Sequence, residues 1–180
     1  NNIDLNKGFI ENKGQWDNDV IYGLQLKNLN VAILEDGIAY DFYQINNDEK
    51  SISGHVVKLD FLGSIDSKFA ELKPLAGKLN IIKGNDPGKW MTGIRQFGAV
   101  AIKGIYPGIS VVNFIQDGFP RSDFLIHPGA DPADIRFTFE GAKNISVDEE
   151  KGIVFETRFG DVYQGKLFAY QNINGQKEQV

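Results

Sequence analysis

Two tryptophans lie at the ends of polar segments that have the composition of a sugar-binding site. Trp16 follows Asn12-Lys13-Gly14-Gln15, and Trp90 follows Asn85-Asp86-Pro87-Gly88-Lys89. An aromatic ring can stack on one face of a sugar while neighbouring amide and carboxylate groups bind its hydroxyls. Trp16, Trp90, Asn85 and Asp86 are therefore the candidate ligand-binding residues. The alternative, which we favour, is that each indole fills one end of a β-sandwich.

The side chains that most often carry out catalysis form no recognisable constellation. The two histidines, His55 and His127, end different predicted strands, whereas a zinc site needs three or four convergent ligands. The chain has no cysteine. Ser110 lacks the second glycine of a nucleophile elbow, and neither glycine-rich phosphate-binding motif occurs. We therefore predict no catalytic residue, no metal site and no cofactor, and expect that the protein is not an enzyme.

Carboxylates within strands leave a weaker enzymatic alternative open. Asp60, Asp123 and Glu156 lie inside predicted strands, and two facing acids can hydrolyse a glycoside. Because every second side chain of an alternating strand faces water, we favour exposed acids without a catalytic role.

Carboxylates next to proline leave a second alternative, a calcium ion. Asp131 and Asp134 flank Pro132, and Asn85-Asp86 precede Pro87, so oxygen ligands lie in rigid turns. In Asx-Pro turns, however, the same side chains bond their own backbone. We prefer this backbone explanation.

Composition limits the classes of partner. The 180 residues are 42% hydrophobic and 12% aromatic, which is typical of a globular chain. A net charge of -5 opposes binding to nucleic acid or to an anionic membrane, and the apolar runs are too short for membrane insertion. The chain begins at Asn1 and its one methionine is Met91, so we expect a processed or trimmed piece of a longer protein.

The elements that must position these residues are strands. Apolar and polar residues alternate along most of the chain, most densely between Ile105 and Gly141, and no helical apolar face persists. Asp36-Gly37 predicts a hairpin, because glycine accepts the positive φ of a tight turn. Pro74 predicts an edge strand, and Pro120 predicts a strand that starts late or lies at an edge. Phe9-Ile10 is expected to anchor a polar N-terminal segment on the surface.

The fold class and the domain organisation follow from this pattern. Twenty glycines mark turns along the chain, at a spacing typical of sandwiches and barrels. We predict an all-β fold, an antiparallel β-sandwich with little or no helix, in a single domain of residues 1–180. The string Val57-x-Leu59-x-Phe61-x-Gly63 is similar to Ile135-x-Phe137-x-Phe139-x-Gly141. Two similar packed β-units, residues 1–95 and 96–180, are therefore an alternative, although convergence on hairpin chemistry explains the similarity more simply.

Four strings, taken together and in this order, resemble an uncharacterised bacterial domain. They are Phe9-Ile10-Glu11-Asn12-Lys13-Gly14-Gln15-Trp16, Gly84-Asn85-Asp86-Pro87-Gly88-Lys89-Trp90, Ile105-Tyr106-Pro107-Gly108-Ile109 and Asp123-Phe124-Leu125-Ile126-His127-Pro128-Gly129-Ala130-Asp131-Pro132. The domain stands near the N-terminus of large secreted or surface proteins, often ahead of SBBP (β-propeller) repeats and, in Bacteroidetes, ahead of a type IX secretion sorting tail. The resemblance implies secretion or a cell-surface location and supplies no catalytic residues.

The sequence thus predicts a non-catalytic structural or adhesive module at the N-terminus of a larger secreted or surface protein. Its partners would be the rest of the same polypeptide and a glycan or another surface protein. A carbohydrate-binding module that uses exposed aromatics is the first alternative, and a glycan-active hydrolase is the weaker one.

Overall fold

The computed structural model describes residues 8–46, 48, 50–65, 68–82, 84–173 and 176–180. The described residues form strands, and their only helical segments are two short 3-10 turns, so the predicted all-β antiparallel fold is confirmed. By their internal contacts the residues form two units, Asn1–Glu140 and Gly141–Val180.

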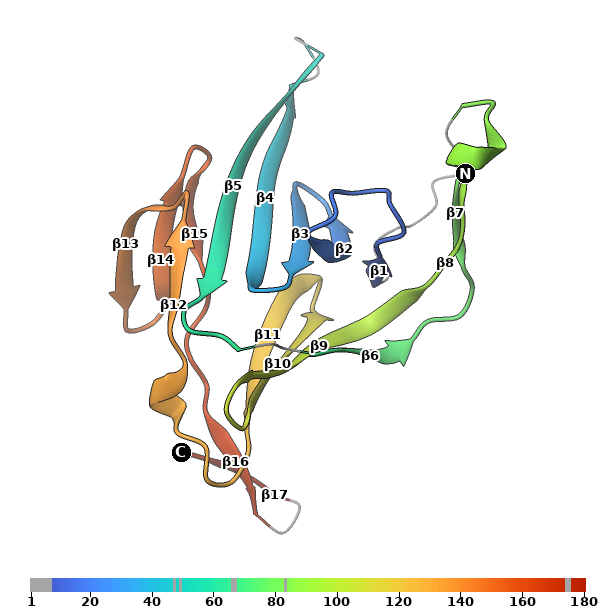
Figure 1. The fold of residues 1–180 in the computed structure, drawn as a ribbon. Coiled ribbons are helices and arrows are strands. Elements are labelled where there is room, and N and C mark those ends of the chain that lie inside the picture. The colour runs from blue at the N-terminus through green and yellow to red at the C-terminus, as the bar shows by residue number, and fades with distance from the viewer. Residues whose placement is uncertain (1–7, 47, 49, 66–67, 83, 174–175) are drawn as a thin grey trace. The chain divides into compact units, whose positions relative to one another are not determined.

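The first unit holds the main sheet (Figure 1). Its elements are β1 (Phe9–Glu11), β2 (Val20–Leu26), β3 (Leu29–Leu34), β4 (Gly37–Asn46), β5 (Ser51–Phe61), β6 (Lys68–Pro74), β7 (Leu79–Ile81), η1 (Pro87–Lys89), β8 (Met91–Ile94), β9 (Gln96–Tyr106), β10 (Ile109–Gln116), β11 (Phe119–Ile126), η2 (Pro132–Asp134) and β12 (Phe137–Glu140). The sheet order is β11-β10-β9-β1-β2-β3-β4-β5-β12, β6 pairs with β9, and β7 and β8 form a separate hairpin. All the pairings are antiparallel.

The main sheet curls so that its two halves pack face to face like a sandwich (Figure 1). The Phe61 ring on β5 meets the Phe124 ring on β11 edge to face, with centroids 6.2 Å apart. Tyr22 on β2 meets Phe97 on β9 in the same way at 6.0 Å. The alternating apolar residues therefore form one core between the two halves, as period-two sequences require.

Strand β1 corrects one expectation from the sequence. Phe9 and Ile10 are 1% and 3% exposed, and they lie in the middle of the sheet, where β1 pairs with β9 and with β2. The sequence predicted a surface segment anchored by this pair. The pair is buried, as an anchor is, but the residues around it form a central strand and do not lie across the surface, because an apolar pair of residues fills a gap between two longer strands. The part of that segment before Gly8 lies outside the described residues.

The division between the units lies after Glu140 rather than near Gln96. A join at residues 95 and 96 would cut the main sheet where β9 begins and pairs with β1. The two similar strings are direct neighbours in that sheet, because Phe137 on β12 pairs with Phe61 on β5 and Phe139 pairs with Leu59. Their similarity follows from lining the same wall of the core.

The second unit consists of hairpins. Its strands are β13 (Lys143–Asp148), β14 (Gly152–Thr157), β15 (Gly160–Tyr163), β16 (Tyr170–Ile173) and β17 (Gln176–Gln179). β13, β14 and β15 form a three-stranded sheet, and β16 pairs with β17. The turn before β14 is held by Asp148, whose carboxylate accepts bonds from the backbone N–H groups of Glu150 and Lys151 at 2.9 and 2.8 Å.

Candidate functional site

Three of the four predicted ligand-binding residues lie in one loop, between β7 and β8. Asp86 caps η1, and its Oδ1 accepts a hydrogen bond from the Gly88 N–H at 3.0 Å. The Trp90 indole Nε1 donates to the Gly84 carbonyl at 3.1 Å. Trp90 remains 39% exposed, and Asn85 and Asp86 are also exposed. The loop therefore holds an aromatic ring in one orientation beside an exposed amide and carboxylate.

Trp16 lies in a different loop, between β1 and β2. Asn12 organises this loop, because its Nδ2 donates to the carbonyls of Asp17 and Val20 at 2.8 Å while its Oδ1 accepts from the Gly14 N–H at 2.9 Å. The indole packs on β2 so closely that a Cβ at Gly23 would lie 2.6 Å from the ring. Trp16 is thus half-buried and packs on β2.

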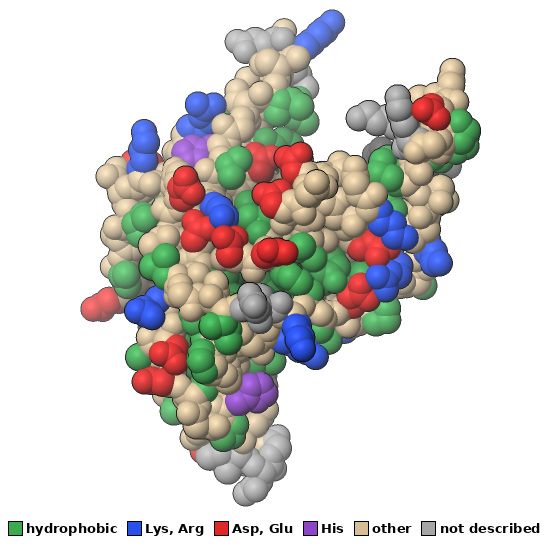
Figure 2. All heavy atoms as spheres, in the orientation of Figure 1, with side chains coloured by type: hydrophobic (Ala, Val, Ile, Leu, Met, Phe, Trp, Pro, Cys, Tyr) green, Lys and Arg blue, Asp and Glu red, His purple; other side chains and the backbone are tan. Residues whose placement is uncertain are grey.

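A network of charged side chains joins β1 and β6 to Arg95, the residue between β8 and β9. Arg95 donates to Glu11 Oε2 through Nε and Nη2 at 2.9 and 2.7 Å, and it binds both oxygens of Glu71 at 2.7 Å. The Arg95 backbone N–H also donates to Glu11 Oε1 at 2.7 Å, and Lys13 Nζ lies 3.3 Å from the same oxygen. Figure 2 shows acidic and basic side chains side by side where the β7–β8 hairpin joins the sheet.

The network shifts the pKa values of its members. Burial would raise the pKa of Glu11, but hydrogen bonds from Arg95 and Lys13 and the Arg95 charge outweigh burial and lower it. Burial and the nearby Glu71 carboxylate raise the pKa of Tyr22 to about 12. Glu11 is therefore ionised and Tyr22 neutral at physiological pH, and neither is poised to exchange a proton there.

An open groove of about 600 Å³ lies beside this network. Its lining residues come from β6, the segment that follows it and the start of β9: Glu71, Pro74, Leu75, Gly77, Lys78, Arg95, Gln96 and Phe97. The Arg95 guanidinium lies 5.2 Å from the centroid of the Phe97 ring. One wall of the groove thus presents the Arg95 cation, which Glu11 and Glu71 hold, next to the Phe97 ring.

The sequence did not indicate the network or the groove. Glu11 and Arg95 are 84 positions apart, and nothing in either neighbourhood marks them as partners. The one weak indication of the network in the sequence was Glu11, a charged residue directly after the apolar pair Phe9-Ile10. It is 8% exposed, and a carboxylate so deeply buried requires a cation.

The other acids singled out from the sequence form local bonds. Asp60 pairs with Lys58 and Asp123 pairs with Arg121, each at 2.7 Å, and Glu156, in the second unit, accepts a hydrogen bond from Asn144. Asp131 caps η2, because its side chain accepts a hydrogen bond from the Ala133 N–H at 2.9 Å. Asp86 caps η1 in the same way.

Two further features concern the described residues as a whole. No group of three or more His, Asp or Glu side chains in the described part of the chain is arranged to hold a metal ion. Among the same residues, no helix is long and apolar enough to cross a membrane.

Comparison with known proteins places the chain in a family. No curated protein matches it, and no solved structure matches it either. A family model described as Domain of unknown function (DUF7948) matches residues 9–180. This match begins at the first residue of β1 and runs to the last residue, Val180, so it includes both units. The chain therefore belongs to the DUF7948 family, an uncharacterised domain, as the four strings indicated at that level.

Proposed function

We propose that this domain is a non-catalytic structural or adhesive module of a larger secreted or cell-surface protein. In this proposal it stands ahead of SBBP repeats and a type IX secretion sorting tail, as the resemblance of the four strings implies. Its partners are the rest of the same polypeptide and a glycan or another surface protein.

The observation that carries the proposal is how the strongest polar interactions are used. The Glu11–Arg95–Glu71 network joins β1 and β6 to the residue before β9, and Asn12, Asp86 and Asp131 bond the backbone of their own loops. These groups hold loops and strands in fixed positions, which is what a scaffold requires. An enzyme would instead be expected to turn such groups toward a reacting atom.

An activity screen tests the non-catalytic part of the proposal. The purified chain is assayed against panels of glycosides, esters and peptides, with Asp123→Asn as the companion variant, and we expect no turnover. Turnover that disappears in Asp123→Asn, with the fold retained by circular dichroism, would show a hydrolase instead. Fractionation of cells that make the full-length protein tests its location, and we expect it in the medium or at the surface.

A second candidate function, carbohydrate binding, is favoured by the loop between β7 and β8. Trp90 is exposed, and its Nε1 bond to Gly84 fixes the ring plane, so little conformational entropy is lost when a sugar stacks on it. Asn85 and Asp86 offer a donor, acceptors and a charge in the same loop. Trp16 contributes less in this arrangement, because its ring is packed on Gly23.

A glycan array distinguishes this function from a purely structural one. We expect Trp90→Ala to abolish any binding, while Ile82→Ala, which removes another exposed apolar side chain near the same loop (56% exposed), leaves it unchanged. Binding that survives in Trp90→Ala, or that falls equally in both variants, would rule out the Trp90 loop as the sugar site.

A further inference from the structure

The long hairpin of β4 and β5 leaves part of one strand paired on a single side. β4 pairs with β5 from Gly37 and Asp60 to Asn46 and Ser51, whereas β12 pairs only with residues 58–61 of β5. The rest of β5, residues 51–57, has no strand on its second edge among the described residues. In Figure 1 the hairpin extends beyond the ends of β3 and β12.

The register identifies which backbone groups lie on that edge. The Phe61 N–H donates to Asp36 on the β4 side at 2.9 Å, and the Leu62 N–H donates to Arg136 on the β12 side at 2.8 Å. Because the two sides alternate residue by residue along an antiparallel strand, the N–H and C=O groups of Ile52, Gly54 and Val56 point away from β4. These groups are available to another strand.

The side chains at this edge are apolar and exposed. Ile52 is 71% exposed and Val56 is 55% exposed, and Ile45, directly opposite Ile52 on β4, is 59% exposed. Figure 2 shows hydrophobic side chains on the arm that this hairpin forms. The segment from Ser51 to Val57 contains no Asp, Glu, Lys, Arg or Pro.

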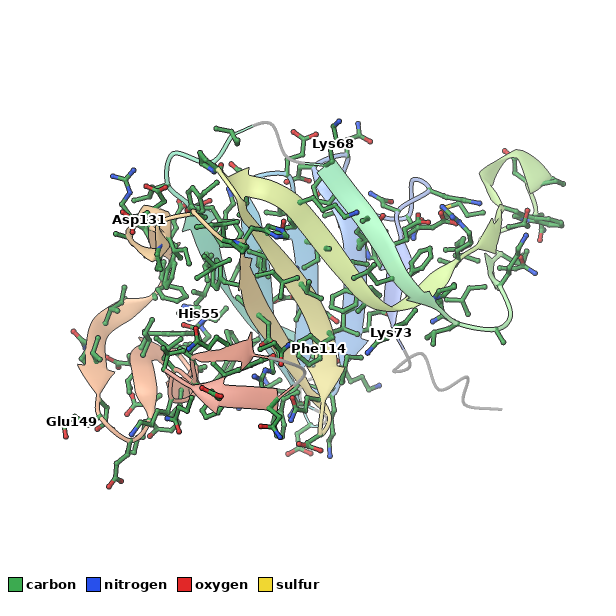
Figure 3. All side chains as sticks on the ribbon, turned by 90° about the horizontal axis from the view of Figure 1, so that it is seen from below. His55, Lys68, Lys73, Phe114, Asp131 and Glu149 are labelled. Atoms are coloured by element: carbon green, nitrogen blue, oxygen red, sulfur yellow. The ribbon has the colours of Figure 1, made fainter. Side chains whose placement is uncertain are left out.

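Two other edges of the sheet carry the residues that block strand addition. β6 has Lys68 and Lys73 near its two ends (Figure 3), with a positive φ of 50° at Lys73 and a proline at position 74. β11 carries Pro120 and Arg121. Lysine, proline and local kinks are the usual protections of exposed edges. Residues 51–57 of β5 contain no lysine, proline or kink of this kind, although β5 is one of the longest strands.

We propose that this edge pairs with the same edge of a second copy of the chain. In an antiparallel arrangement about Gly54, Ile52 of each copy lies opposite Val56 of the other, and the two Gly54 residues face each other. The spacing Ile52-x-Gly54-x-Val56 is thus self-complementary, as a two-fold interface requires. An uncharged segment also lets two chains of net charge -5 approach each other there.

The pairing joins two hairpins into a four-stranded sheet, in which Ile45, Ile52 and Val56 of both copies lie on one face. Three residues a side make a small interface, at or below the low end of the range for stable complexes. The dimer is therefore weak and reversible, and it forms at high local concentration, such as on a crowded surface.

The test is a concentration series of the full chain, followed by sedimentation velocity and by amide exchange in NMR. We expect self-association, together with slower exchange of the Ile52, Gly54 and Val56 amides as the concentration rises. The amides of Ser53 and Val57, which bond β4, stay unchanged. A non-specific contact between apolar surfaces would not slow the exchange of every second amide in this way.

Two lysine variants make the test specific. Val56→Lys places a charge on the edge and is expected to weaken association at least about tenfold. Phe119→Lys is the matched control, because Phe119 is 72% exposed and is the first residue of β11, the edge strand protected by Pro120 and Arg121. This variant should associate like the wild type. Circular dichroism checks that both variants are folded.

Three results would overturn the proposal. The first is a wild-type chain that stays monomeric at every concentration, and the second is association that Val56→Lys leaves unchanged. The third is a monomeric chain in which an unrelated alternating apolar peptide protects the same three amides, since the edge would then take a foreign strand and not a second copy.

Discussion

Glu11 is the residue on which the junction of β1 and β9 depends most. Its side chain is 11% exposed, and its carboxylate accepts bonds from both the side chain and the backbone of Arg95. A buried carboxylate with such partners is stabilised as the anion, while the loss of its charge leaves the partners without a strong acceptor.

We expect Glu11→Gln to lower the free energy of unfolding by about 1–3 kcal/mol at pH 7. Since the native pKa of Glu11 lies below its ordinary value of 4.5, its ionisation stabilises the fold above that pH. This contribution is lost as the pH falls through the lowered native pKa. The difference between wild type and variant, measured by urea denaturation, should therefore shrink below about pH 4.5.

Glu71→Gln is the matched control for this variant. The Glu71 side chain is 32% exposed, so water and salt screen its pair with Arg95, and we expect a loss of only about 0–1 kcal/mol. Equal losses in the two variants would contradict the special role given to Glu11.

Gly23 and Trp16 give a second prediction at the same scale. A Cβ at position 23 would lie 2.6 to 2.9 Å from three indole atoms, so Gly23→Ala should push the ring off β2 and cost about 1–3 kcal/mol. In a Trp90→Phe background, where Trp16 is the only tryptophan, the tryptophan emission should shift to the red. Unchanged emission would mean that the ring does not cover Gly23.

Single residues were predictable from the sequence where their partners are local. Asp86 and Asp131 cap their turns as Asx-Pro geometry requires, because the acceptor and donor are two positions apart. Glu11 and Arg95 were not predictable, because only the strand order brings residues 84 positions apart together. The candidate groove depends on the same order.

At the scale of elements, the hairpin at Asp36-Gly37 was predicted correctly, but for a reason that the structure replaces. β3 and β4 do pair across this turn, yet Gly37 does not adopt a positive φ. Glycine is needed there because a Cβ would lie 2.3 Å from the Leu59 carbonyl oxygen on β5. The constraint comes from the neighbouring strand, which the local sequence does not reveal.

Two glycine variants separate the two reasons. We expect Gly37→Ala to lower the melting temperature strongly, because the Cβ forces β4 and β5 apart at a cost of about 1–3 kcal/mol or more. Gly118→Asn should cost less than about 1 kcal/mol. Gly118 has φ +82° with no atom within 4 Å of its Cβ position, and asparagine tolerates that backbone. A Gly37→Ala chain that melts like the wild type would contradict the steric argument.

Edge strands were also predictable, because proline acts locally. Pro74 and Pro120 lie on β6 and β11, which are both edges of the main sheet, as the missing N–H requires. The position of β1 was not predictable. Three residues carry too short a pattern to show whether a strand lies at the edge or in the centre of a sheet.

For the whole molecule, the division after Glu140 predicts unequal behaviour of the two units. Every buried residue that lines the core between the two halves of the main sheet belongs to the first unit. A fragment ending at Glu140 should therefore keep a cooperative thermal transition. The peptide Gly141–Val180, near the size below which a chain rarely folds without disulfides or metals, should lack one. Circular dichroism of the two fragments checks this, and a disordered first fragment would contradict it.

The all-β class of the molecule was predictable because period-two alternation and frequent turns act at short range. The pairing order was not, since it depends on which strands close the core together. Function is the property least predictable from the sequence, because a β-scaffold places its functional residues in loops whose partners come from distant strands.

The central position of β1 has a consequence for the time at which the sheet is completed. β1 pairs with β2 on one side and with Gln96 and Phe97 of β9 on the other, so its second edge stays unpaired until the chain has reached about residue 97. At roughly 5–20 residues per second this delay is several seconds, whereas a hairpin forms in about 1–10 μs. Throughout that interval the β9-facing edge of β1 is open to pairing with strands of other nascent chains, so a strand at the centre of the finished sheet is for a time an edge strand.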